Sequence, residues 1–261
     1  MRILFVNHND DIRFFRLMEA IRNIGPSYTV AHANQLLPNE ELEKFAPTVI
    51  FHNLPVLTSY PAETNAICIN FNESDSERSF SFENEGADNY IKDFVDLLPR
   101  NRDDSTKYTG DVIYNGDPRV FQESLEYLVN SKNFDFRFFH KTPFNISGYA
   151  GNITRGELNS FYSNSRASIF LDNEKPEIMN AVINDANAIL FDPDNQEKFK
   201  SDLEEVIAGK EYDNPDLPSK EDILANDTSV DRMIWIFKKI GLSKVSSDLK
   251  SLKSKLLKEY K

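Results

Sequence analysis

Hydrophobic and polar positions along the chain form two series of alternating strand and helix patterns. Short apolar runs alternate with segments whose apolar residues recur at helical spacing, a pattern typical of parallel βαβ units. The polar, turn-rich stretch 100–107 (RNRDDSTK) separates the two series, and we interpret it as an interdomain linker. The first series predicts strands at 2–7, 28–32, 47–53 and 66–71, with helices around 14–21 and at 39–45. The second predicts strands at 111–115, 134–139, 167–171 and 188–191, with helices at 121–129, 155–164, 176–182, 196–207 and 230–240.

These patterns predict an α/β fold made of two Rossmann-like halves. We expect an N-terminal domain at 1–100, a second domain at 108–230 and C-terminal helices at 231–261. In this arrangement the two halves face a cleft, and a ligand is expected to bind in it.

Composition narrows the class of protein without naming a function. Charged residues make up 28 % of the 261 residues and hydrophobic ones 40 %, as in ordinary globular proteins. No stretch approaches the ~20 apolar residues of a membrane span, so we expect no membrane association. Cys68 is the one cysteine, so the chain can form no internal disulfide, which fits a cytoplasmic location. Because Cys68 lies in a predicted strand, a position in the core is favoured over a role as a nucleophile.

The charge of the chain is uneven. Its net charge of −12 is unfavourable for binding nucleic acid unless positive charge is concentrated somewhere. The segment 244–261 contains six lysines and two acidic residues, a net charge of +4. Val245, Leu249, Leu252 and Leu256 recur there at helical spacing, which predicts an amphipathic helix. Its lysines form either a solvated face or a phosphate-contacting surface, and the spacing does not decide between them.

Several common catalytic and nucleotide-binding motifs are missing. The nine glycines form neither GxGxxG nor GxxxxGK[ST], which argues against classical dinucleotide dehydrogenases and P-loop enzymes. The four histidines lack the spacing of a catalytic zinc site. Acidic residues are plentiful but suggest no ligand set, so a divalent metal is not indicated and metal dependence stays open.

Polar residues cluster where predicted strands end. A carboxylate at such a place can take a proton from an acceptor hydroxyl. Asp10 and Asp11 follow the first strand, where helix capping is an equal alternative. Glu73 and Asp75 follow the fourth strand before no obvious helix start, which favours them as catalytic residues.

Three runs in the second half resemble a known enzyme family. They are DVIYNGDPR after Gly110, the run from Tyr149 to Asp172 with its Gly–x–Ile turn, and the run from Lys175 to Asp192. Their order and spacing over about residues 108–208 resemble the nucleotide-sugar-binding domain of GT-B glycosyltransferases, and most closely the DNA β-glucosyltransferases of T-even bacteriophages. Spore-maturation-type glycosyltransferases show a looser likeness.

The resemblance implies roles for individual residues and a UDP-sugar as donor. Gly116 and Arg119 would hold the diphosphate, through backbone approach and guanidinium respectively. The backbone from Gly151 to Ile153 would recognise the uracil edge. Glu73 lies nearest the family's catalytic base, with Asp75 second.

Two positions depart from the family pattern. Where the family has an arginine for phosphate and a glutamate for ribose, this chain has Glu177 and Asn180. Asn180 can still hydrogen-bond a ribose, whereas Glu177 would repel phosphate. A second family arginine is missing near Gln122. Fewer cations imply a weaker donor site, a different donor or no transfer.

The resemblance therefore predicts a glycosyltransferase that moves a sugar from a UDP-sugar to a hydroxyl, such as that of 5-hydroxymethylcytosine in phage DNA. The enzyme would act in the host cytoplasm, on double-stranded DNA whose target base is flipped out of the duplex. Transfer to a saccharide or small molecule, and a non-catalytic GT-B protein that binds a nucleotide or a partner, stay open as alternatives. Candidate DNA-phosphate contacts are Arg13, Arg16, Lys250 and Lys253.

Overall fold

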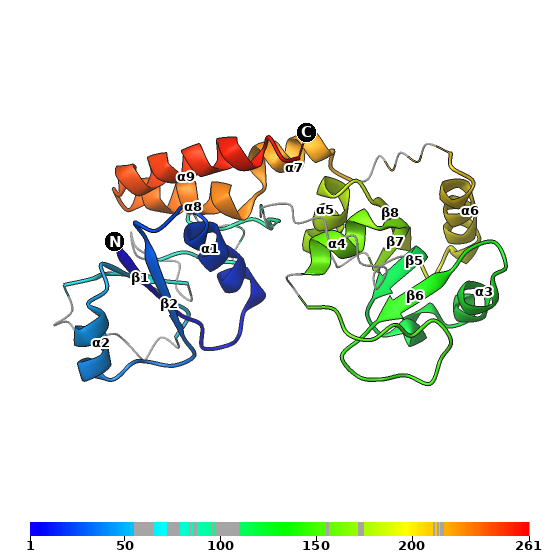
Figure 1. Ribbon diagram of the computed structural model, residues 1–261, viewed down its shortest axis with the longest axis horizontal. Helices are drawn as coiled ribbons and strands as arrows, with labels where there is room; N and C mark the ends of the chain where they lie inside the picture. Colours follow the sequence, from blue (N-terminus) through cyan, green and yellow to red (C-terminus); the bar gives the residue numbers. More distant parts are fainter. Residues whose placement is uncertain are drawn as a thin grey trace. The chain divides into compact units, whose positions relative to one another are not determined.

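The chain forms two compact α/β units in the computed structural model (Figure 1). The first comprises Met1–Pro99 and Leu224–Glu259, and the second Arg100–Ile223. The structure describes residues 1–54, 65–71, 79–83, 85, 88–95, 97, 110–154, 157–171, 175–210, 212, 214 and 217–260.

The first unit contains a four-stranded parallel sheet with the order β2-β1-β3-β4. The central strands are buried on both faces, as the continuous apolar run of β1 predicts. These strands are β1 (Arg2–Val6), β2 (Thr29–Ala33), β3 (Val49–His52) and β4 (Ile67–Asn70).

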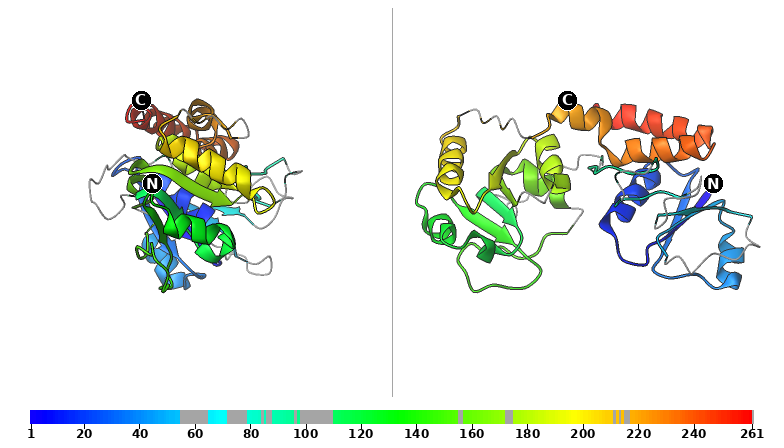
Figure 2. Two further views of the ribbon diagram at one scale, coloured as in Figure 1. Left: turned by 90° about the vertical axis from the view of Figure 1, so that its right-hand side faces the viewer. Right: turned by 180° about the vertical axis from the view of Figure 1, so that it is seen from behind.

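Helices cover both faces of this sheet. On one face, the ring of Phe5 packs against Phe14 of α1, and Phe51 packs against Phe237 of α8. On the other face, Leu4 and Val6 share a core with Leu42 of α2. Helix α9 lies along α8, as the right-hand view in Figure 2 shows. The helices of this unit are α1 (Ile12–Arg22), α2 (Asn39–Phe45), α8 (Ser229–Lys239) and α9 (Ser243–Leu256).

The second unit repeats the plan, with the strand order β6-β5-β7-β8, again all parallel. A core that includes Phe121 and Phe199 covers one face, and a second core with Phe161 and Ile178 covers the other. The strands are β5 (Gly110–Asn115), β6 (Phe136–Phe139), β7 (Ser165–Leu171) and β8 (Asn187–Phe191). The helices are α3 (Ser124–Asn130), α4 (Leu158–Ser163), α5 (Lys175–Ile183), α6 (Gln196–Ile207) and, at the boundary between the units, α7 (Lys220–Asn226).

The helix predicted at 121–129 is wrong in its first turn. A 3₁₀ helix (Pro118–Phe121) comes first, and α3 begins only at Ser124. Gln122 between them has a φ of 45°, which interrupts helical geometry.

The strand order of each sheet marks the place where a ligand is expected. In both sheets the chain crosses over the first strand to reach the third, which makes a topological switch point between β1 and β3 and between β5 and β7. Open parallel sheets bind ligands outside the carboxyl ends of the strands at such points. The loops after these strands are therefore the natural candidates for function.

Candidate functional site

The turn after β5 is tightly packed at the switch point of the second sheet. The backbone N–H of Gly116 donates to Phe139 O at 2.9 Å, which joins the turn to the end of β6. The Tyr114 ring occupies the space that a side chain at position 116 would need, with Cζ 2.6 Å from the site of a Cβ. Asp117 caps the following 3₁₀ helix by accepting from Arg119 N at 3.0 Å. The sequence thus builds a rigid turn at this edge of the sheet.

Arg119 presents its guanidinium at this turn. Its Nε lies 2.9 Å and 3.0 Å from the two carboxylate oxygens of Asp117, and its Cζ lies 5.2 Å from the centre of the Phe144 ring. The hydrogen bonds from Arg119 lower the pKa of Asp117 to about 2, so this carboxylate stays charged at neutral pH. Arg119 Nη2 also donates to Asp117 Oδ2, so the two side chains form a bidentate pair. The Arg119 side chain is still 70 % exposed, and its remaining N–H groups are open to an anion.

A short segment extends the edge of the second sheet beside β6. Phe138 N donates to Gly148 O at 2.9 Å, Ala150 N to Phe138 O at 3.0 Å, and His140 N to Gly151 O at 2.8 Å. Gly151 has a φ of +106° and open space where a side chain would lie. The segment 148–151 therefore lies next to the carboxyl end of β6 and leads into Gly151–Ile153, whose backbone the resemblance implies would recognise the uracil edge.

The two positions on α5 that depart from the family pattern contact each other. Asn180 is buried, and its Nδ2 lies 3.5 Å from Glu177 Oε2. The Tyr162 hydroxyl donates to the same oxygen at 3.3 Å. Glu177 and Tyr162 also line a cavity of about 20 Å³, with room for one water molecule. A carboxylate that contacts Tyr162 and Asn180 thus lies where the resemblance implies a cation.

At the first sheet, polar side chains also gather at the switch point. Asn7 follows β1 and Asn53 follows β3; both are buried, and Asn53 Nδ2 donates to Asn7 Oδ1 at 2.9 Å. Asp11 caps α1 by accepting from Arg13 N at 2.8 Å. Its carboxylate therefore has the helix-capping role that the sequence analysis gave as the alternative to catalysis. The predicted catalytic residues Glu73 and Asp75 lie outside the described residues.

The four candidate phosphate contacts differ in exposure. Arg13 pairs with Asp11 at 2.8 Å and Glu83 at 2.6 Å and stacks over a phenylalanine ring. Arg16 is buried and donates to Phe94 O at 3.1 Å, so its guanidinium is not on the surface.

The lysines of α9 differ in their ion pairs: Lys253 is paired with a carboxylate of the same unit, whereas others form no ion pair with a described residue. Lys253 pairs with Asp231 at 2.6 Å and is only 13 % exposed. Lys250 is exposed and forms no ion pair with any described residue, and the same holds for Lys244 and Lys255.

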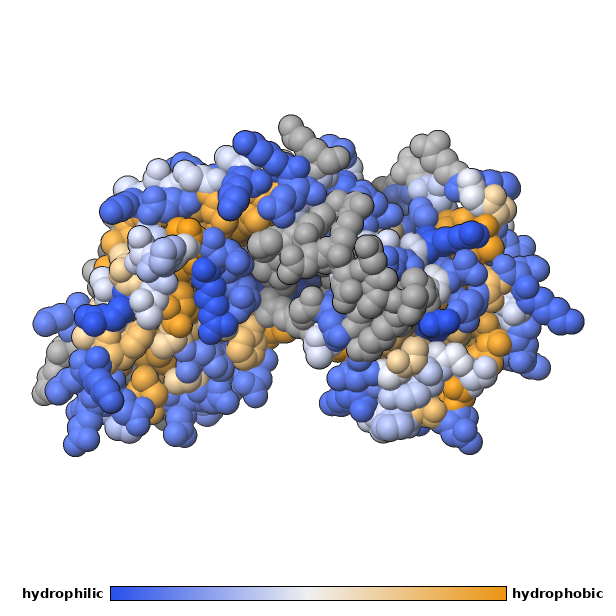
Figure 3. All heavy atoms as spheres, viewed as in Figure 1, coloured by the Kyte–Doolittle hydropathy of each residue, from blue (hydrophilic) through white to orange (hydrophobic). Residues whose placement is uncertain are grey.

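Hydrophilic residues cover most of the visible face of both units (Figure 3).

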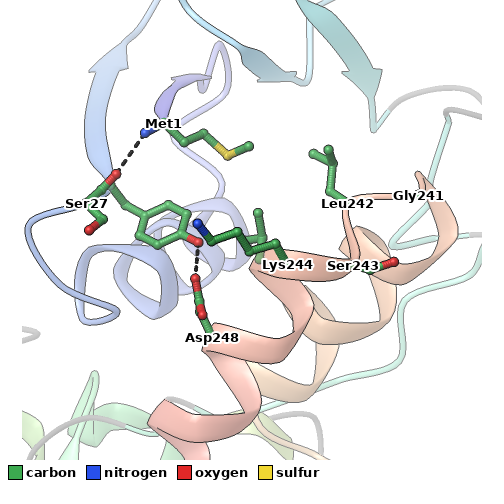
Figure 4. A pocket seen from close by; sticks show the side chains of 9 residues that line it. Met1, Ser27, Gly241, Leu242, Ser243, Lys244 and Asp248 are labelled. Carbon is green, nitrogen blue, oxygen red and sulfur yellow. Dashed lines mark hydrogen bonds between the residues drawn. The ribbon is translucent and has the colours of Figure 1, made fainter.

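A groove of about 620 Å³ opens beside α9, where Lys244 extends towards Ser27 (Figure 4). The Tyr28 hydroxyl donates to Asp248 at 2.5 Å across this groove. Burial, together with this hydrogen bond, raises the pKa of Tyr28 from 10.0 to about 12.

Tyr28 gives the protein a defined alkaline sensitivity. A folded-state pKa above the unfolded value means that the stabilisation is complete below pH 10 and is lost as the pH rises towards 12. We expect the difference in unfolding free energy between the wild type and Tyr28→Phe to be constant up to pH 10 and to shrink above it. Urea denaturation at several pH values measures this, and a difference that does not change with pH would contradict it.

No metal site or membrane span is found in the part of the chain described. Its His, Cys, Asp and Glu residues form no group of three or more that could hold a metal ion. Its helices include none of the length and apolar character that crossing a membrane requires.

Comparisons with known proteins give a likeness in structure alone. No family model matches the sequence, and no curated protein matches it. Two solved structures of a DNA-modifying β-glucosyltransferase match, one described with and without its substrate uridine diphosphoglucose and the other as the T4 phage enzyme with UDP-glucose. Each is 13 % identical, with a TM-score of 0.35, over 100 % of this chain and 97 % of the other.

Proposed function

We propose that the protein is a glycosyltransferase that moves a sugar from a UDP-sugar to a hydroxyl group, with 5-hydroxymethylcytosine in DNA as the acceptor. The observation that carries the proposal is the exposed Arg119 guanidinium on a rigid turn at the switch point of the second sheet. The motifs of residues 108–208 that resemble nucleotide-sugar-binding domains support the same assignment.

The donor would bind at the carboxyl edge of the second sheet. Arg119 would donate to the diphosphate and stabilise the charge that develops on it as the sugar leaves. The backbone of Gly151 and Ile153 would recognise the uracil, and Gly116 would allow the diphosphate to approach the turn. Asn180 would hydrogen-bond a ribose hydroxyl, for which its side chain would have to leave its buried position beside Glu177.

The acceptor would bind at the carboxyl edge of the first sheet. A carboxylate that follows one of the strands of this sheet would take the proton of the acceptor hydroxyl, and the family resemblance favours Glu73 or Asp75 in this role. For a DNA acceptor, the exposed Lys250 would contact phosphate, and Arg13 would do so after exchanging a carboxylate partner. Arg16 and Lys253 would not contact DNA, because the side chains of both are held inside the first unit.

Replacing Arg119 tests the donor site. Arg119→Gln is expected to weaken UDP binding roughly tenfold to a hundredfold, because it removes charge-assisted hydrogen bonds to the diphosphate. Isothermal titration calorimetry with UDP measures this. Arg137→Gln is the matched control, since Arg137 also pairs with an aspartate on the second unit but lies on β6 away from the turn. Equal affinities of wild type and Arg119→Gln would rule out the proposed donor site.

A non-catalytic nucleotide- or partner-binding role is the second candidate. The Glu177 carboxylate favours it, because it lies where the resemblance places a cation and would weaken diphosphate binding. UDP binding without transfer to any acceptor would support this role over catalysis.

A further inference from the structure

The loop between β1 and α1 is closed by one buried side chain. Asn7 Oδ1 accepts from Asp11 N at 2.9 Å, and Asn7 Nδ2 donates to Asp11 O at 3.0 Å. The side chain of Asn7 therefore bridges the start and the end of the loop. Asn7 is 1 % exposed, so these bonds form away from competing water.

A second buried amide ties this loop to the neighbouring strand. Asn53, directly after β3, accepts from His8 N at 2.6 Å through Oδ1 and donates to Asn7 through Nδ2. β1 and β3 are adjacent strands, and the sheet has its switch point between them. The asparagine pair thus fixes the loop at the place where a ligand of this sheet is expected.

The fixed loop holds Asp10 in an unusual conformation. Its φ is 52°, in the left-handed region that aspartate adopts more readily than most residues with a side chain. Asn7 and Asn53 impose it here by holding both ends of the loop.

Asp10 and Asp11 differ sharply in their partners. The Asp11 carboxylate caps α1 and pairs with Arg13. The Asp10 side chain is exposed and forms no hydrogen bond or ion pair with any residue that the structure describes. Of these two carboxylates, only that of Asp10 is available to an incoming hydroxyl.

We infer that Asp10 is the general base for the acceptor, an inference that rests on the function proposed above. The acceptor oxygen bonds to the anomeric carbon of the sugar while the bond from that carbon to the diphosphate oxygen breaks. UDP leaves with the electron pair of that bond, and the acceptor proton passes to an Asp10 carboxylate oxygen. Asn7 and Asn53 are positioning residues, because they act through the loop that carries Asp10.

Two substitutions at position 10 separate catalysis from folding. Asp10→Asn is expected to lower kcat about 10²–10⁴-fold, with little change in UDP affinity. Asp10→Gly is expected to lose kcat equally and to keep the conformation of the loop, because glycine adopts a positive φ without strain. Glu40→Gln, which alters an exposed carboxylate on α2, is the matched control and is expected to retain activity.

The pH profile distinguishes the base from its positioning residue. Wild type and Asn53→Ala are expected to lose kcat on acidification, as the base is protonated, although Asn53→Ala starts from a lower maximum. Asp10→Asn is expected to lack this acidic limb. Wild-type kcat in Asp10→Asn, or an acidic limb that disappears only in Glu73→Gln or Asp75→Asn, would overturn the role of Asp10 alone. A wild type that binds UDP but transfers no sugar would overturn the proposed function itself.

Discussion

Phe121→Ala is expected to destabilise the second unit by about 3–5 kcal/mol, as large-to-small changes in aromatic cores do. Phe121 is fully buried, and its ring packs edge-on against Tyr114 at 4.7 Å and Phe191 at 5.0 Å between ring centres. It also ends the 3₁₀ helix that carries Arg119. The cavity left by its removal would therefore loosen the candidate donor turn as well as the core.

Hydrogen exchange measures both consequences of this change. Amides of β5 and β7 are expected to exchange about a hundredfold faster or more in Phe121→Ala, since each 1.4 kcal/mol is a factor of ten. Val120→Ala, at the neighbouring and only partly buried position, is expected to have less than half this effect on stability. A cost below about 1 kcal/mol for Phe121→Ala would show that the described core is not the one that holds the turn.

Gly148→Ala is expected to lower the free energy of unfolding by about 2–5 kcal/mol. Gly148 has a φ of +90°, which costs a residue with a side chain about 1–2 kcal/mol. In addition, a Cβ at this position would lie 2.6 Å from Phe136 O, too close for any real contact, and relieving it costs about 1–3 kcal/mol. UDP binding is expected to weaken in parallel, because the segment 148–151 would shift away from β6.

Gly151→Ala provides the matched comparison. Gly151 also has a positive φ but has open space around the added carbon, so only the backbone cost of about 1–2 kcal/mol applies. Urea denaturation of both variants separates the two contributions. If Gly151→Ala lowers the free energy of unfolding as much as Gly148→Ala does, the close approach of Gly148 to β6 does not contribute to the effect of the substitution.

Much of the fold follows from local patterns in the sequence. The apolar run RILFVN predicts the buried strand β1, and the helices at 39–45 and 196–207 have the predicted bounds. Helix α7 was missed, because it is short and its sequence shows no apolar repeat; Ile223 is its buried residue. The C-terminal helices pack with the first unit, through pairs such as Phe51 with Phe237 that sequence spacing cannot reveal.

The candidate site was predictable only in part. The turn at Asn115–Arg119 stands out in sequence, because glycine and arginine directly follow a strand. The Asn7–Asn53 pair depends on β1 and β3 being neighbours, which the strand order decides and local patterns do not. Arg16 resembles any charged residue on a helix in sequence, and only its burial and its hydrogen bond to Phe94 O show that its guanidinium is internal.

The most direct test of the proposed function is the release of UDP from UDP-glucose by the purified protein. Three reactions are compared: with duplex DNA containing 5-hydroxymethylcytosine, with the same duplex containing unmodified cytosine, and without DNA. We predict release with the hydroxymethylated duplex alone, accompanied by a DNA mass increase of one hexose per modified base. Absence of release in all three reactions, with UDP-glucose and other UDP-sugars alike and with a protein shown to be folded, would contradict the assignment as a DNA glycosyltransferase.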